Sequence, residues 1–191
     1  MPDIKGTKTE QNLLKAFAGE SQARSRYTYF AEQAAAEGLT RIADIFMETA
    51  ENELEHARLF FSFLEGGAVE ITATYPAGEV ATTAENLAAA AAGENEEWVE
   101  LYPAFAKIAE EEGFKAVART FKMIAKVEAE HENRYRELLE TVEKEQVYEK
   151  AEKVRWKCGV CGYVHESTKA PASCPCCDVD REEFEIESRN W

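Results

Sequence analysis

The chain has 191 residues, of which 45% are hydrophobic, enough for one ordinary domain with a real core and a small further module. Its net charge of -15 argues against nucleic acid as a partner, because phosphate repels an acidic surface. No segment approaches the ~20 apolar residues that a membrane span needs. The polar N-terminus also does not resemble a signal peptide, so we expect a cytoplasmic protein without a membrane partner.

Four long segments are predicted to be helices, and they follow one another as residues 7–38, 40–67, 82–113 and 114–148. Thr7 and Thr82 each open a Thr-x-x-Glu capping pattern, while Gly38 and Gly113 are good helix terminators. Pro103 falls inside the third helix and is expected to kink it. The short gaps after the first and third helices predict two antiparallel hairpins.

The two hairpins are joined by a long connection and resemble each other. The connection contains Pro76 and Gly78, and one long crossover between two hairpins is the ferritin-like bundle topology. Matching residues recur in both halves, and the offset between them grows by one residue part-way along: Ala18-Gly19-Glu20 with Ala92-Gly93-Glu94, Glu53 with Glu128, and Glu55-His56 with Glu130-His131. This internal repeat predicts a pseudo-twofold bundle whose hairpins bring the same residues inward.

A glutamate interrupts the apolar stripe of every predicted helix near its middle, at Glu20, Glu53, Glu94 and Glu128. At ~1.5 Å per residue these positions lie at a similar height, so the carboxylates should form one layer. His56 and His131 lie three residues after two of them, on the same faces. Unpaired charges in a core would each cost on the order of several kcal/mol, so the pattern predicts bound cations.

The number and type of these ligands point to two metal ions. One Glu from each of two helices and a Glu-x-x-His from each of the other two form di-iron or di-manganese sites. Oxygen-rich ligation with one histidine per metal favours iron or manganese over structural zinc.

Glu97 and two tyrosines extend this site. Glu97 lies three residues after Glu94, and its counterpart in the repeat is Ala23, so it is predicted to be an asymmetric seventh ligand. The acidic run around it leaves a surface position as the alternative. Tyr27 and Tyr102 lie on the ligand faces of their helices. Each is either a hydrogen-bond donor to a ligating carboxylate or an ordinary core tyrosine.

The sequence changes character after Glu149, where charged residues give way to Trp, Gly, Pro and Cys. We place a linker near residues 146–153 and divide the chain into domains 1–150 and 151–191. All five cysteines lie in the second domain, and in a reducing cytosol they are interpreted as metal ligands. Two C-x-x-C elements strongly predict a tetrahedral four-sulfur site at Cys158, Cys161, Cys174 and Cys177.

This second domain is too short to build a large core and therefore needs its metal for stability. Cys176 is interpreted as a spare thiol and His165 as a solvent-facing residue. The cysteine pattern alone does not distinguish iron, which would make a one-electron carrier, from zinc, which would make a structural ribbon.

At these residues the chain resembles the rubrerythrin family over nearly its whole length. The motifs are Glu20, Glu53-x-x-His56, Glu94-x-x-Glu97, Glu128-x-x-His131, and Cys158-x-x-Cys161 with Cys174-Pro175-x-Cys177. The resemblance implies a mainly α fold: a ferritin-like four-helix bundle with a long crossover, followed by a small metal-stapled β domain of rubredoxin type. The chain departs from the family pattern at Asp178, where glycine is usual, and at Cys176, which is an extra cysteine.

The resemblance also implies an activity, a non-haem peroxidase that reduces hydrogen peroxide to water. Two irons would be held by the motif glutamates and histidines with Tyr27 beside them, and one iron would exchange Glu97 for His56 between oxidation states. A third iron at the four cysteines would relay electrons. The family further implies a head-to-tail homodimer and electrons from NAD(P)H through a rubredoxin or a separate reductase.

Two other functions remain possible at this point. A ferroxidase of ferritin type would use the same bundle, although iron storage does not require an attached electron carrier. A bundle with a zinc ribbon would be a non-catalytic binding module.

Overall fold

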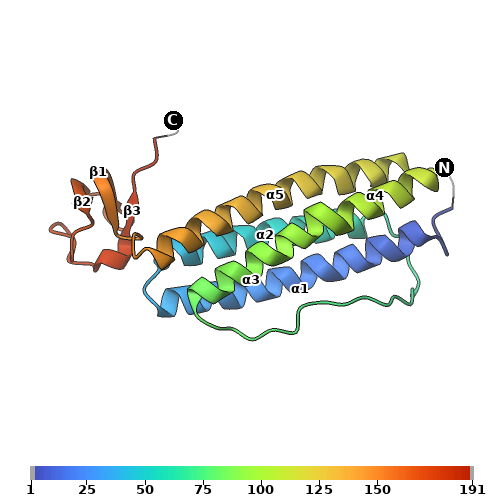
Figure 1. Cartoon of the computed structure of the whole chain (residues 1–191), viewed down its shortest axis with the longest axis horizontal. Coiled ribbons are helices and arrows are strands. Elements are labelled where there is room, and N and C mark those ends of the chain that lie inside the picture. Colours follow the sequence, from blue (N-terminus) through green and yellow to red (C-terminus); the bar gives the residue numbers. More distant parts are fainter. Residues whose placement is uncertain (1–2, 190–191) are drawn as a thin grey trace.

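The computed structural model describes residues 3–189. Helices α1 (Lys8–Ala36) and α2 (Thr40–Phe61) form the first hairpin. Helix α3 (Thr83–Glu96), the π-helical turn η1 (Glu97–Leu101) and helix α4 (Tyr102–Glu111) form one continuous rod that pairs with α5 (Lys115–Glu143). Figure 1 shows the four rods side by side, with a small sheet at one end. The mainly α fold with one long crossover is confirmed. Within the described residues, no helix combines the length and apolar character needed to cross a membrane.

The two halves of the bundle hold each other by reciprocal capping. The Glu37 carboxylate, at the end of α1, accepts a hydrogen bond from the Thr83 backbone N–H at 3.0 Å, in the first turn of α3. The Glu112 carboxylate, at the end of α4, accepts one from the Thr9 backbone N–H at 2.9 Å, in the first turn of α1. Both carboxylates satisfy N–H groups that have no partner inside their own helix. The internal repeat in the sequence thus corresponds to a pair of equivalent capping contacts between the two hairpins.

Two helix ends and the position of one helix irregularity differ from the sequence prediction. The disturbance expected at Pro103 appears just before it, as the π turn η1; the wider turn accommodates a proline that cannot donate to the preceding turn. Helix α2 ends at Phe61, short of the glycine pair. Helix α5 ends at Glu143, because Glu145 adopts a left-handed φ of 54° and the Gln146 N–H closes onto Thr141 O at 2.8 Å.

Two aromatic clusters fill the bundle. Tyr27, Phe46 and Tyr135 are fully buried in one cluster, and their ring centroids lie 5.2–6.2 Å apart. Phe60, Tyr102 and Phe121 are their counterparts in the other, at 4.9–5.8 Å. Burial of each ring contributes roughly 1.5–3 kcal/mol. These clusters hold the four rods in register where the predicted ligands lie.

The crossover between the hairpins runs along the outside of the bundle beside α1 (Figure 1). It has no regular secondary structure over residues 65–82. The Tyr75 hydroxyl donates to the Lys15 carbonyl of α1 at 2.8 Å and anchors the segment there.

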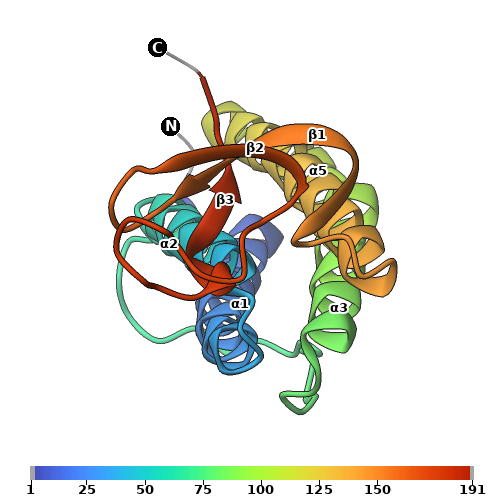
Figure 2. The same ribbon diagram turned by 90° about the vertical axis from the view of Figure 1, so that its left-hand side faces the viewer.

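The C-terminal sheet has the order β2-β1-β3 and is antiparallel, with β1 (Glu149–Cys158), β2 (Val164–Lys169) and β3 (Phe184–Ile186). Strand β1 begins inside the stretch expected to be a linker, so that linker is shorter than predicted. Trp156 and Phe184 form the small core. Figure 2 looks onto this end of the bundle. The Tyr148 hydroxyl donates to Gly38 O at 2.7 Å, which ties the sheet to the α1–α2 turn.

Candidate metal centres

The predicted glutamate layer exists and is withdrawn from solvent. All four layer glutamates have at most 1% of their surface exposed, and both histidines are buried. Two groups of ligand atoms lie within 4.8 Å of one another, and both groups contain Glu53 and Glu128. The groups are completed by Glu20 with His56 and by Glu94 with His131. The structure therefore places two adjacent four-ligand clusters that share their two central carboxylates.

The histidines direct the same ring atom into the layer. His56 Nδ1 lies 2.8 Å from Glu53 Oε2 and 3.0 Å from Glu128 Oε1. His131 Nδ1 lies 2.8 Å from Glu128 Oε2 and 3.2 Å from Glu53 Oε1. Each imidazole thus faces both shared carboxylates, as a metal-ligating nitrogen would.

The hydrogen bonding of the layer is incomplete without cations. Among residues 3–189, the buried Glu20 Oε2 and Glu94 Oε2 atoms have no hydrogen-bond partner, and Glu53 Oε1 and both Glu128 oxygens have only the histidine nitrogens described above. Leaving a buried acceptor unpaired costs ~1–3 kcal/mol, and more when it is charged. Two divalent ions would satisfy these oxygens and neutralise the carboxylates together, so the residues present fit a di-metal centre.

The protonation of the metal-free layer reflects the same crowding. Burial first, then the Glu53 charge, raises the pKa of Glu94 to about 8. Burial alone would also raise the pKa of Glu53, but its contacts with His131 and His56 outweigh this and bring it to about 2. Burial would lower the pKa of His56, but the Glu128 and Glu53 carboxylates raise it to about 10. Without metal, protons therefore do part of the neutralising.

Two tyrosines donate hydrogen bonds across the bundle to the layer. Tyr27 of α1 donates to Glu94 Oε1 of α3, and Tyr102 of α4 donates to Glu20 Oε1 of α1, each at 2.5 Å. Of the two readings left open by the sequence, the hydrogen-bond donor to a carboxylate is the one that the structure supports. Each bond orients one carboxylate and leaves its second oxygen for a cation.

Glu97 stands apart from both ligand clusters. It opens the π turn η1, is half-buried, and lines a pocket. Burial, and then repulsion by Glu94, raises the pKa of Glu97. Its role as the seventh ligand stays a prediction.

Glu132 was missed by sequence analysis. Its buried carboxylate accepts from Trp98 Nε1 at 2.5 Å, Asn95 Nδ2 at 2.9 Å and Arg136 Nε at 2.6 Å. Asn95 and Trp98 flank Glu97 in the chain, so Glu132 fixes the turn that carries it. The sequence gives no sign of this, because Glu132 reads as one more acidic residue on a charged helix.

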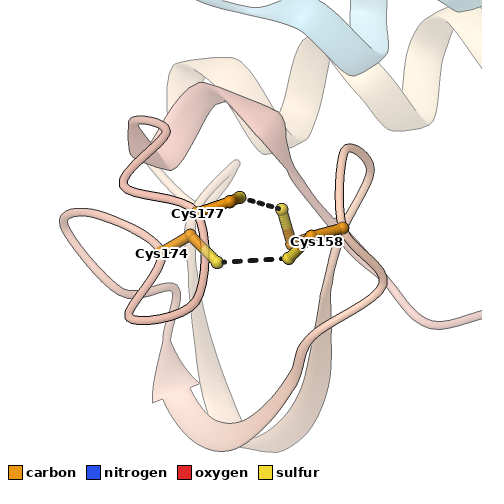
Figure 3. Close-up of side chains that lie close together, drawn as sticks. Cys158, Cys174 and Cys177 are labelled. Carbon is orange, nitrogen blue, oxygen red and sulfur yellow. Dashed lines mark hydrogen bonds between the residues drawn. The ribbon is translucent and has the colours of Figure 1, made fainter.

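The four predicted cysteines also come together. Cys158 Sγ lies 3.8 Å from Cys177 Sγ, and Cys161 Sγ lies 3.5 Å from Cys174 Sγ (Figure 3). These separations fit the ~3.8 Å edge of a tetrahedron with metal–sulfur bonds of about 2.3 Å. Cys176 is exposed and outside the group, as expected of a spare thiol.

The two cysteine knuckles have the same backbone geometry. The Gly162 N–H donates to Cys158 O at 3.0 Å, and the Asp178 N–H donates to Cys174 O at 2.9 Å. Both residues have left-handed φ angles, 78° for Gly162 and 58° for Asp178. Asp178 therefore occupies a position where glycine is free of strain and aspartate is not.

Comparison with known proteins decides the family. A family model described as Rubrerythrin matches residues 11–139, and one described as the rubredoxin-like domain of rubrerythrin matches residues 156–185. The rubrerythrin of Porphyromonas gingivalis is 62% identical over 188 residues, which cover 98% of this chain and 94% of that protein. The chain belongs to the rubrerythrin family.

Other relatives agree over the same length. The rubrerythrin of Nitratidesulfovibrio vulgaris is 49% identical over 191 residues and 100% of both chains. A solved structure of nigerythrin in its fully reduced, all-ferrous state matches with a TM-score of 0.64 and 29% identity, over 96% of this chain and 91% of that one. Symerythrin from Cyanophora paradoxa matches with a TM-score of 0.61 and 26% identity, over 74% and 89% of the two chains. As a member of the rubrerythrin family, the chain has a di-iron site in its bundle and an iron site at its clustered cysteines.

Proposed function

We propose that this rubrerythrin-family chain reduces hydrogen peroxide to water, with electrons relayed through its four-cysteine iron site. The observation that carries the proposal is the presence, in one chain, of a buried carboxylate–imidazole layer and a separate four-thiolate cluster. The reaction consumes one peroxide, two electrons and two protons and releases two waters. The ligands that we assign to the two irons are Glu20, Glu53, His56, Glu94, Glu97, Glu128 and His131. Those of the third iron are Cys158, Cys161, Cys174 and Cys177.

Bound iron supplies the electrons that break the O–O bond. The protein supplies geometry: Glu53 and Glu128 face both metal positions, and the Tyr27 and Tyr102 hydroxyls fix the outer carboxylates. The aromatic clusters keep bulk water away from the layer, which strengthens every charge interaction inside it.

Glu97 is the residue to which we assign a changing role. In this structure His56 belongs to the ligand cluster of Glu20 and Glu97 does not, an arrangement compatible with one ligand replacing the other. In the metal-free layer, burial and then Glu94 raise the pKa of Glu97, which favours a proton on its carboxyl group. We propose that this proton is available to the leaving oxygen.

The route of the electrons is also a proposal. The cysteine site lies beyond one end of the bundle, while the glutamate layer lies in the middle of the helices (Figure 1). A head-to-tail homodimer would place the cysteine site of one chain beside the layer of its partner. We propose such a dimer, fed by a rubredoxin or an NAD(P)H-dependent reductase. We also propose a division of the chain near residue 150 and a cytoplasmic location, where a reducing environment keeps the thiolates available to metal.

Complementation tests the electron route. A chain with Cys174→Ser would be mixed with a chain with Glu128→Gln, each inactive alone, under conditions that allow dimers to exchange. Transfer between subunits predicts recovered peroxide reduction in the mixture, and transfer within one chain predicts none.

A rapid-mixing experiment tests the activity itself. The chemically reduced, iron-loaded protein is expected to be oxidised much faster by hydrogen peroxide than by oxygen. Faster oxidation by oxygen would favour the ferroxidase. Metal analysis of the same sample, with three irons per chain as the proposal, separates both enzymes from a zinc-containing binding module.

A further inference from the structure

A pocket of about 320 Å³ lies between helix α1, the crossover and the π turn η1. The crossover forms its outer wall with Tyr75 and Pro76, and Phe105 contributes a further aromatic wall. Its inner end is formed by Glu97 and by the two tyrosines that donate to the glutamate layer. The pocket therefore extends from the exterior of the bundle to Glu97 and to the two tyrosines that contact the glutamate layer.

Glycines of the internal repeat line this pocket from both sides. Gly19 and Gly93 each precede a layer glutamate, and each lies in the interior of a helix, where glycine costs ~1 kcal/mol relative to alanine. A Cβ atom on Gly19 would lie 3.7 Å from Tyr75 Cε1 and 3.8 Å from Glu97 Oε1. One on Gly93 would lie 3.5 Å from Arg26 Nη2. The absent side chains are thus part of the open space.

Two polar side chains in the wall of the pocket each have a buried atom that forms no hydrogen bond within the described part of the chain. Gln22 and Arg26 line it, and among residues 3–189 the buried Gln22 Oε1 and Arg26 Nε atoms have no hydrogen-bond partner. One is an acceptor and the other a donor. A hydroperoxide, R–O–O–H, donates one hydrogen bond and accepts others, so a wall that contains polar side chains suits it. A small alkyl group R would lie against the aromatic wall, as in most small-molecule sites.

We propose that this pocket is the port through which hydroperoxides reach the metal centre, and that Gly19 and Tyr75 set the largest hydroperoxide that passes. The inference rests on the proposed peroxidase function and extends its substrate class to small alkyl hydroperoxides. The reaction is ROOH + 2 electrons + 2 protons → ROH + H₂O. The O–O bond breaks, bound reduced iron would supply the two electrons, and the alkyl group leaves as the alcohol.

Another recess does not offer the same route. It lies on the α1–α2 face between Phe17, Leu54 and Phe61, and none of the predicted metal ligands or the tyrosines that contact them lines it. The port proposal therefore concerns the pocket that contains Glu97.

The first test measures passage without turnover. Azide, a small linear anion, would be mixed rapidly with the air-oxidised, iron-loaded protein, and its binding followed by visible absorption. Gly19→Ala narrows the port and adds only ordinary van der Waals contacts with Tyr75 and Glu97, so the association and dissociation rates should both fall, by about tenfold, while Kd changes little. Ala18→Val, the neighbouring position outside the pocket, is the matched control and should leave both rates unchanged. Unchanged azide rates in Gly19→Ala would overturn the proposal.

The second test compares substrates. The ratio of the rate with tert-butyl hydroperoxide to the rate with hydrogen peroxide should fall about tenfold in Gly19→Ala and rise in Tyr75→Ala. Tyr75→Phe keeps the ring and loses only the bond to Lys15 O, so its ratio should match the wild type. Equal ratios in all four proteins would contradict a size-selecting port.

The two proposals fail separately. A wild-type protein that reduces no peroxide, with azide rates that still respond to Gly19→Ala, overturns the peroxidase and supports the port. If the enzyme is active but the azide rates and substrate ratios are the same in the wild type, Gly19→Ala and Tyr75→Ala, the peroxidase function stands and the port proposal is wrong. The metal-free Gly19→Ala protein should melt at a higher temperature than the wild type, because alanine stabilises the helix interior. If Gly19→Ala does not fold, Tyr75→Ala is the deciding variant. Faster azide binding and release would support the port, and unchanged rates would overturn it.

Discussion

Tyr102 of α4 donates its hydroxyl to Glu20 Oε1 of α1 at 2.5 Å, so that a residue of one half of the repeat orients a predicted ligand of the other. Tyr102→Phe removes that donor and leaves the carboxylate with one fewer bond. We expect the metal-free protein to lose roughly 1–3 kcal/mol of unfolding free energy, the cost of leaving a buried acceptor with one partner fewer. Denaturant unfolding of the apoprotein measures this.

Tyr135→Phe is the control for that variant. Tyr135 is equally buried, but within residues 3–189 its hydroxyl has no hydrogen-bond partner. The substitution should therefore leave stability unchanged or raise it slightly. A loss as large as that of Tyr102→Phe would show that ring packing, not the carboxylate bond, is responsible.

The reciprocal caps predict an acid-sensitive bundle. Hydrogen bonds from Thr9 outweigh the effect of burial and hold the pKa of Glu112 below its usual value, and those from Gln33 and Thr83 do the same for Glu37. A lowered folded-state pKa means that the stabilisation is complete above the unfolded-state value and is lost as pH falls through the folded-state value. Glu112→Gln should cost about 1 kcal/mol at neutral pH and less in acid.

Thermal unfolding as a function of pH measures that effect. Glu111→Gln removes the same charge from the neighbouring residue, which makes no side-chain hydrogen bond recorded in the described structure, and should retain the wild-type pH profile. Parallel curves for the wild type and Glu112→Gln would contradict the capping argument.

Glu132 is predicted to hold the π turn. Glu132→Ala frees the Trp98 indole N–H and the Asn95 amide together, so the turn that carries Glu97 should loosen. Faster amide hydrogen exchange over residues 97–101 and a change in tryptophan fluorescence are expected. Glu130→Ala, an exposed residue on the same helix, should change neither.

The cysteine assignments predict a sharp contrast between near neighbours. Cys174→Ser removes a buried thiolate of the cluster, so the C-terminal site should lose its iron and the absorption that accompanies it. Cys176→Ser changes an exposed thiol outside the cluster and should retain both. Iron content per chain measures the difference, and iron loss in Cys176→Ser would require a different ligand set.

Asp178 carries backbone strain and a charge, and two substitutions separate them. Asp178→Gly relieves the left-handed conformation and should stabilise the C-terminal domain by about 1 kcal/mol. Asp178→Asn removes only the charge, and should raise the reduction potential of the nearby iron by roughly tens of millivolts, since the residue is exposed and water screens it. Potentiometric titration of both variants tests this, and equal potentials in wild type and Asp178→Asn would exclude an electrostatic role.

The bundle and its metal ligands could be predicted from the sequence because the ligands occur at helical spacing on the buried stripes. Glu20, Glu53, Glu94 and Glu128 were identifiable as a layer since each replaces an apolar residue on a buried stripe. The cysteine cluster was identifiable from spacing alone. Both predicted sets come together in the structure.

The pocket and the Glu132 contacts could not be predicted in the same way. The path of the crossover over α1 depends on single contacts such as Tyr75 with Lys15, and no periodic pattern encodes it. Glu132 is one of many acidic residues on helix surfaces, and only its partners distinguish it. The end of α5 was predicted wrongly for a related reason. Glu145 ends this helix through a left-handed conformation that glutamate rarely adopts.

The π turn coincides with one extra residue in the second half of the internal repeat. The interval from Glu94 to Glu112 is one residue longer than the interval from Glu20 to Glu37, and η1 lies within the longer one. An inserted residue would rotate a regular helix by about 100°, and the wide turn absorbs that rotation. The asymmetry between the halves is therefore one of chain length as well as of side chains. Deleting one residue from η1 would turn it into a regular α-helix and rotate the segment around Glu97 by about 100° in a single step. Substitutions alone keep the chain length, so they would not remove the π turn in this way.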